Sequence, residues 1–133
     1  MPDELDLEEV ELPETAFLWR RIPPWHYKFE ENAGDFRPTT AAFEDNPDGQ
    51  PMSAYIADEC AQPENALAGH DGYGLVAIPI SVLKAKNMKI VRQEVEGPRG
   101  HVGVVGKKTD GVRKAIKRAS IWVVRAREED NQT

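Results

Sequence analysis

Short runs of alternating or continuous apolar residues recur along the chain, and most of them predict β-strands. In residues 16–22 (AFLWRRI), Phe17 and Trp19 would point to one side of a strand, and Leu18 and Ile22 to the other. Comparable runs predict further strands at residues 52–57, 75–80, 89–95 and 101–105. Residues 121–124 (IWVV) are either the last turn of a helix or a final strand, and their β-branched side chains favour the strand. The predicted sheet therefore contains many short strands.

Residues 110–120 have helical spacing. Val112, Ala115, Ile116 and Ala119 fall on one stripe and basic side chains on the other, with Asp110 as the predicted cap. Shorter helices are predicted at residues 37–43 behind a threonine cap, at 58–67 around Pro63, and at 82–86 behind Ser81. Residues 25–37 show no clear period and predict an ordered loop or a broken strand.

These elements together predict an α+β fold. We expect a mixed, mostly antiparallel sheet with a few short helices and one basic amphipathic helix near the C-terminus. We divide the chain into an acidic tail at residues 1–14, a single domain at 15–127 and an acidic C-terminal tail at 128–133. A domain of this length buries one core without a metal or a disulfide.

Composition narrows the classes of protein that fit. The single cysteine, Cys60, excludes an internal disulfide, and no metal site or cofactor is predicted. The first 14 residues lack the basic and apolar regions of a signal peptide, and the apolar run at 74–83 is too short to cross a membrane. We expect a cytoplasmic protein that makes no membrane contact.

Charge is divided unevenly along the chain. Residues 1–80 carry a net charge of -13, whereas residues 81–127 carry +10. This division favours an anionic partner for the basic half. The alternative is that the acidic tail, or the acidic half of a neighbouring copy, already faces the basic surface.

Gly106-Lys107-Lys108-Thr109 lies at a predicted strand-to-helix junction. A P-loop needs a glycine where His101 stands, and the second lysine breaks the spacing. What remains is an anion site at a helix start, to which Lys107 and Lys108 would contribute. Nucleic-acid binding through the basic helix is a weaker prediction, because no helix-turn-helix partner precedes the helix. The GPRG sequence at 97–100 matches the clamp of KH domains but joins two predicted strands, which indicates a hairpin turn.

Histidines and arginines supply the candidate chemistry. His70, in a glycine-rich loop, and His101, at a strand start, are candidates for moving a proton. Arg20 and Arg37 are candidates for holding a phosphate-bearing ligand, unless they pair with nearby aspartates and only stabilise loops. Cys60 follows two acids, which argues against a reactive thiolate.

Three functions follow from the residues. The first is an interaction or accessory protein that acts through a protein partner or homo-oligomer. The alternative is a small nucleotide- or phosphate-handling enzyme with an Arg/His site, and nucleic-acid binding is third.

Four strings, LWRRI (18–22), RPTTAAF (37–43), GHDGYGLV (69–76) and HVGVVGKKT (101–109), resemble those of a group of small uncharacterised bacterial proteins. The resemblance covers roughly residues 17–124 and implies no activity. A more distant similarity, through the arginines of LWRRI and a later Ser/Thr segment, is to NAD-using toxins of the ADP-ribosyltransferase type. The chain departs from those toxins in having no clear catalytic acid motif near its C-terminal strand.

Overall fold

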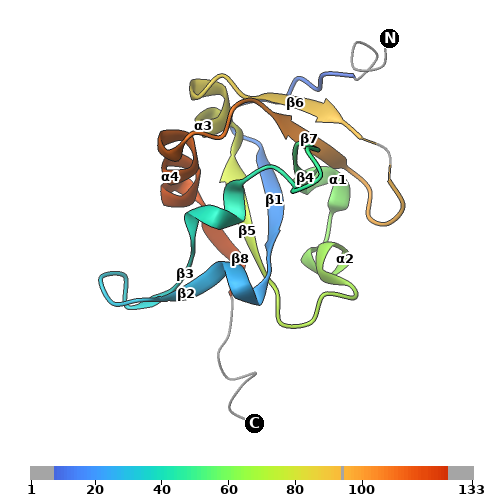
Figure 1. The fold of residues 1–133 in the computed structure, drawn as a ribbon. Coiled ribbons are helices and arrows are strands. Elements are labelled where there is room, and N and C mark those ends of the chain that lie inside the picture. The colour runs from blue at the N-terminus through green and yellow to red at the C-terminus, as the bar shows by residue number, and fades with distance from the viewer. Residues whose placement is uncertain (1–7, 94, 126–133) are drawn as a thin grey trace.

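A six-stranded antiparallel sheet organises the fold (Figure 1). The computed structural model describes residues 8–93 and 95–125. The sheet has the order β6-β7-β4-β1-β5-β8, and every neighbouring pair is antiparallel. The strands are β1 (Phe17–Ile22), β4 (Met52–Ile56), β5 (Gly74–Pro79), β6 (Lys89–Arg92), β7 (His101–Val105) and β8 (Ile121–Val124). The predicted α+β class is confirmed.

Helices cover both faces of this sheet. On one side lie η3 (Thr40–Phe43), α3 (Ile80–Ala85) and α4 (Asp110–Ala119), which enclose the main core. On the other side lie α1 (Ala57–Cys60) and α2 (Pro63–Leu67), over a smaller cluster. The main core includes Leu18, Ile22, Phe43, Ile78, Val102 and Ile116, all fully buried. Because side chains alternate along a strand, β1, β4 and β5 each contribute side chains to the main core on one face and to the smaller cluster on the other.

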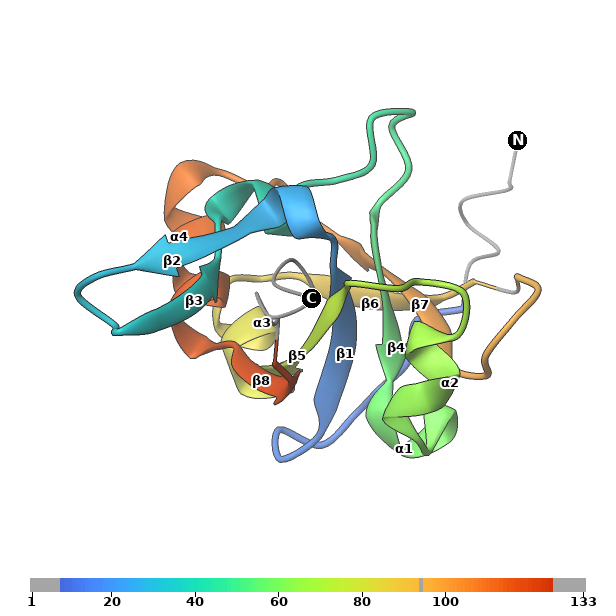
Figure 2. The same ribbon diagram turned by 90° about the horizontal axis from the view of Figure 1, so that it is seen from below.

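A hairpin replaces the loop or broken strand predicted at residues 25–37. It follows η2 (Pro24–His26) and pairs β2 (Tyr27–Glu30) with β3 (Asp35–Pro38). Gly34 has a φ of +67°, which suits the short turn. Figure 2 shows the hairpin beside α4. The helix predicted at 37–43 is consequently shorter, since the chain is extended up to Pro38.

Two helix starts differ from the prediction. Thr109, and not Asp110, caps α4, because the Thr109 hydroxyl accepts a hydrogen bond from the backbone of Val112. The helix α3 begins at Ile80 directly after Pro79, ahead of the predicted Ser81 cap. Ile80 is fully buried, so packing moves the start towards the core.

The first described residues lie along the outer edge of β6. Val10 N donates to Ile90 O at 2.8 Å, and Arg92 N donates to Glu8 O at 2.7 Å. Lys84 Nζ donates to Leu12 O at 2.8 Å. Two backbone hydrogen bonds and one from the Lys84 side chain therefore hold residues 8–12 in place. Residues 1–7 of the predicted acidic tail lie outside the described part of the chain, as does the predicted tail at 128–133.

Candidate functional site

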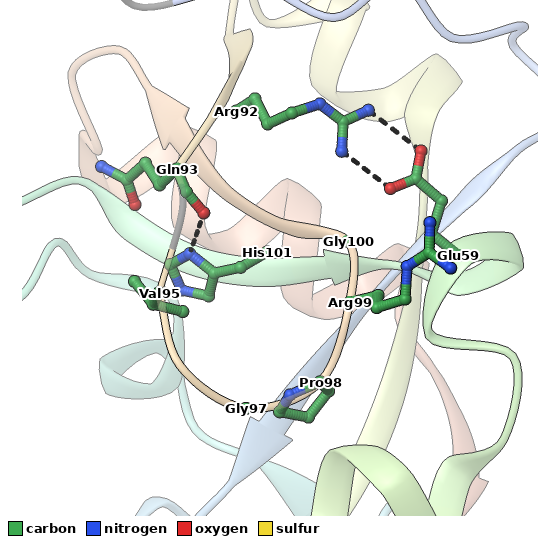
Figure 3. A pocket seen from close by; sticks show the side chains of 9 residues that line it. All are labelled: Glu59, Arg92, Gln93, Val95, Gly97, Pro98, Arg99, Gly100 and His101. Atoms are coloured by element: carbon green, nitrogen blue, oxygen red, sulfur yellow. Dashed lines mark hydrogen bonds and ion pairs between the residues drawn. The ribbon is translucent and has the colours of Figure 1, made fainter.

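A pocket of about 290 Å³ opens where the β6–β7 hairpin meets α1 (Figure 3). Polar groups form most of its lining, and they come from α1 and from the β6–β7 hairpin. The lining residues are Glu59, Arg92, Gln93, Val95, Gly97, Pro98, Arg99, Gly100 and His101. A concave site with several convergent polar groups is the usual place to look for ligand binding.

The hairpin turn approaches α1 closely because of Gly100. Its φ is +90°, and a Cβ at this position would lie 2.9 Å from Glu59 Cβ and 3.1 Å from Ile56 O. The approach is fixed by Ile56 N, which donates to Gly100 O at 2.8 Å. A residue with a side chain would therefore push the turn away from Glu59 and reshape the pocket.

Glu59 and Arg92 form a two-pronged ion pair in the pocket wall, with N–O distances of 2.7 and 2.9 Å. The hydrogen bonds from Arg92 lower the pKa of Glu59, although partial burial opposes the shift. The charges of Arg92 and Arg99 lower this pKa further. Glu59 is thus an anion whose charge is offset by Arg92, while exposed Arg99 forms no hydrogen bond or ion pair with the described residues.

His101 is held in one tautomer at the base of the pocket. Its Nδ1 lies 3.2 Å from Gln93 O (Figure 3), and a carbonyl oxygen only accepts, so Nδ1 carries the hydrogen. The Nε2 lone pair has no hydrogen-bond partner among residues 8–93 and 95–125. Burial lowers the pKa of His101, with a further reduction from the charge of Arg21 that the Gln93 hydrogen bond opposes. His101 is therefore a neutral base at pH 7.

A chain of contacts leads from His101 to His70. The His101 ring packs edge-on against Tyr55 with 5.2 Å between centroids, and Arg21 donates to the Tyr55 hydroxyl. Arg21 NH1 lies 2.6 Å from His70 Nε2. His70 Nδ1 lies 2.9 Å from Ala68 O, so this nitrogen is the donor and Nε2 accepts from Arg21. Arg21 thus carries a half-buried charge that no carboxylate offsets within the described residues.

No protein-family model, curated protein or solved structure matches the chain. Among the described residues, no group of three or more His, Cys, Asp or Glu side chains is arranged to hold a metal ion. No helix in the same part of the chain is both long and apolar enough to span a bilayer.

The structure brings the two predicted histidines to the same face of the sheet, at opposite ends of this contact chain. Arg20 faces the other side, where it donates to Ala42 O at 2.6 Å and to Ser53 O at 2.5 Å. Its burial, together with the charge of Arg21, lowers the pKa of Arg20 to about 10. Arg20 therefore ties η3 to β4 and does not reach the His101 pocket.

The remaining predicted residues lie near α4. Arg37 donates to Lys117 O at 2.9 Å at the end of that helix. Lys108 is 4% exposed and binds Asp45 together with two backbone carbonyls, whereas Lys107 is exposed. Neither lysine lines the His101 pocket.

Glu59, Arg92 and Arg99 belong to the pocket but were not predicted. Glu59 and Arg92 are 33 positions apart, and no local pattern joins them. The GPRG turn signal would have placed Arg99 at a hairpin tip, but a turn alone does not reveal a pocket. For Cys60, burial raises the pKa of the thiol, a direction that agrees with the sequence argument.

Proposed function

We propose that this chain binds a small phosphate-bearing ligand in the pocket beside His101, and that His101 exchanges a proton with it. One observation carries the proposal: a neutral imidazole, fixed by Gln93 O, shares a pocket with Arg92 and Arg99. Arginines suit the binding of a phosphate group, and a neutral histidine beside it can accept a proton. The proposal corresponds to the enzyme alternative, with Arg99 and Arg92 in place of Arg20 and Arg37.

Charge and shape support an anion of modest size. Among the described lining residues, Arg92 and Arg99 together outweigh Glu59, which leaves a net positive charge. The planar fork of Arg99 suits two phosphate oxygens, and this side chain has no other hydrogen-bond partner in the described part of the chain. Because Glu59 already orients Arg92, Arg99 is the side chain that would close on the ligand.

His101 supports proton transfer. A base is useful when it is deprotonated at the working pH, and burial and Arg21 favour that form of His101. Its Nε2 would accept a proton from a hydroxyl group or a water molecule held next to the phosphate. Arg21, fixed by Tyr55 and His70, would act as a positioning residue that disfavours the imidazolium form.

The test is a titration of the full chain with inorganic phosphate and with adenosine 5′-monophosphate. Calorimetry measures the affinity, and NMR of the histidine side chains reports their protonation. We expect binding that weakens about fivefold or more in R99Q, which corresponds to about 1 kcal/mol. The matched control K107Q changes an exposed cation outside the pocket and should bind as the parent does. Bound phosphate should also raise the titration midpoint of His101, since an anion stabilises the imidazolium.

Two outcomes would contradict the proposal. One is the absence of binding by both compounds at millimolar concentration. The other is equal weakening by R99Q and K107Q, which would indicate diffuse charge attraction. Thermal unfolding of each variant separates a lost contact from a lost fold.

A second candidate function, self-association, rests on strand β8. This strand pairs with β5 on one side only among the described residues, and its Ile121 and Val123 are 59% and 38% exposed. An apolar sheet edge can pair with the same strand of another copy. Sedimentation of the parent and of V123K tests this idea, because a charge on the edge should abolish any dimer. The cytoplasm remains the compartment that we propose for either function.

A further inference from the structure

A second pocket lies between the C-terminal half of α4, the β2–β3 hairpin and η3, the elements shown together in Figure 2. Its volume is about 410 Å³, and its lining is largely cationic. The lining residues are Glu30, Arg37, Thr40, Lys114, Lys117 and Arg118. None of them belongs to the His101 pocket. We refer to it as the α4 pocket.

Helix geometry gathers three of these cations. Lys117 and Arg118 follow Lys114 by three and four positions, so both lie near Lys114 on one side of α4. The fourth cation is Arg37, which hydrogen bonds to backbone carbonyl oxygens hold in place. Arg37 NH2 donates to Lys117 O at 2.9 Å and to Ser120 O at 3.3 Å, which fixes the guanidinium against the helix end.

Several donors in the α4 pocket are still available. The Nε and NH1 groups of Arg37 make no hydrogen bonds with residues 8–93 and 95–125, and neither does the Thr40 hydroxyl. Arg118 is exposed and forms no ion pair within the described chain. Lys114 lies 4.0 Å from Asp110 Oδ2 with both side chains exposed, an arrangement that contributes little energy. An incoming anion would therefore displace no strong interaction.

The charge balance favours a ligand with several negative charges. Lys117 Nζ lies 2.5 Å from Glu30 Oε2, so these two charges offset each other. Arg37, Lys114 and Arg118 then leave three positive charges. The end of a helix normally repels anions, but Arg37 donates to the last carbonyl oxygens of α4 and counters that effect.

We propose that the α4 pocket binds a compact diphosphate group, as found in inorganic pyrophosphate and in diphosphate esters. The Arg37 fork and the Thr40 hydroxyl would hold one phosphate, and Lys114 and Arg118 the other. A single phosphate would leave part of the positive charge unmatched. The backbone of a nucleic acid presents widely spaced phosphates along a track, whereas this site is one concave pocket beside a hairpin.

The test is a calorimetric titration of the full chain with inorganic pyrophosphate, with inorganic phosphate, a glutamate-rich peptide and a short DNA duplex as comparison ligands. Pyrophosphate should bind best and should shift the backbone NMR signals of residues 114–118. R118Q and K114Q should each weaken it about tenfold. R99Q, which alters the His101 pocket, and K107Q, which alters an exposed lysine, should leave the pyrophosphate-induced NMR shifts at residues 114–118, and the affinity they report, within twofold.

The same experiment can overturn the proposal. Tighter binding of DNA or of the acidic peptide at residues 114–118 would replace the diphosphate with that partner. Equal loss in K107Q and R118Q would mean that general charge, and not this pocket, attracts the ligand. Because Lys114 and Arg118 are both exposed, neither variant is expected to unfold, and thermal unfolding checks this. Loss of phosphate binding at His101 in R99Q, with the pyrophosphate response at residues 114–118 intact, would separate the two sites.

Discussion

Lys108 Nζ lies 2.7 Å from Asp45 Oδ1, and the carbonyl oxygens of Val104 and Gly106 lie at the same distance from it. The contact joins the segment after η3 to the connection between β7 and α4. It also unites the two oppositely charged halves of the chain. Four further ion pairs do so: Arg92–Glu59, Arg113–Glu44, Lys117–Glu30 and Arg125–Asp35.

These ion pairs show that acidic and basic parts of the same chain meet in the fold. One alternative from the sequence was that the acidic tail, or the acidic half of a neighbouring copy, faces the basic surface. The acids in these five pairs belong instead to the body of the same chain. Much of the apparent need for an acidic partner is met by folding. The cations outside such pairs, Arg99 and Arg118 among them, are the better guides to ligands.

Replacing Lys108 with methionine should lower the free energy of unfolding by about 1–3 kcal/mol, because Asp45 and two carbonyl oxygens lose their donor. Urea unfolding measures the change. Lys107→Met is the matched control and should stay within about 0.5 kcal/mol, as expected for an exposed side chain. Equal stability of the two variants would show that the enclosed ion pair contributes nothing.

Replacing Arg20 with methionine should destabilise the fold by about 1–3 kcal/mol, because Ala42 O and Ser53 O lose charged donors. Removal of a buried charge offsets part of this loss. Since Arg20 lies on the face of the sheet away from His101, phosphate binding should be unchanged. A stable variant that fails to bind phosphate would instead place Arg20 in the site.

Glycine substitutions in the β6–β7 turn should differ in effect. Gly97 and Gly100 both have positive φ, at +113° and +90°, so alanine at either position costs about 1–2 kcal/mol in backbone strain. Only at Gly100 would the new Cβ meet Glu59 and Ile56, which adds about 1–3 kcal/mol of overpacking. Thermal unfolding of G97A and G100A compares them. If both lose the same stability, the close approach to α1 is less rigid than described.

Stability should fall as the pH is lowered from about 7 to 5. Burial lowers the pKa of both His26 and His101 below the ordinary value of 6.5, so the unfolded chain takes up protons first. The stabilisation is complete above that value and is lost as pH falls through the folded pKa. The slope is at most about 1.4 kcal/mol per pH unit for each histidine. Glu59, whose pKa is also lowered, contributes in the same direction only in more acidic solution, below about 4.5.

Chemical denaturation at several pH values measures this slope. H101Q should flatten it between pH 7 and 5, because glutamine removes the titrating group. H26Q should flatten it too, by a separate amount. An unchanged slope in H101Q would show that the folded and unfolded states bind protons at this position equally.

The sequence predicted the elements whose burial is periodic. The apolar stripe containing Val112 and Ile116 predicted α4 with nearly its observed bounds, and the apolar run at residues 75–80 predicted β5. The β2–β3 hairpin was missed because most of its residues are only partly buried, so no two-residue period marks it. Its aromatic side chains pack on one another instead, with Phe29 and Phe36 at 5.6 Å between ring centroids.

The site was harder to predict than the fold because its contacts join distant segments. His101, a candidate from histidine chemistry, lines the pocket, but its role in moving a proton stays a prediction. Arg92 contacts Glu59 only because the fold brings β6 next to α1. Arg20 and Arg21 are neighbours on one strand and point to opposite faces of the sheet. The register of the strand decides which of them faces Tyr55 and which faces the main core. Sequence composition does not fix that register.

The backbone contacts of residues 8–12 limit how copies of this chain can join. By lying along β6, those residues cover one border of the sheet, while the described residues leave the border at β8 without a neighbouring strand. A sheet with one covered border can gain a partner on the other but cannot extend further. Any pairing through β8 would therefore stop at two copies, and removal of residues 8–12 would expose the border at β6 to a further strand.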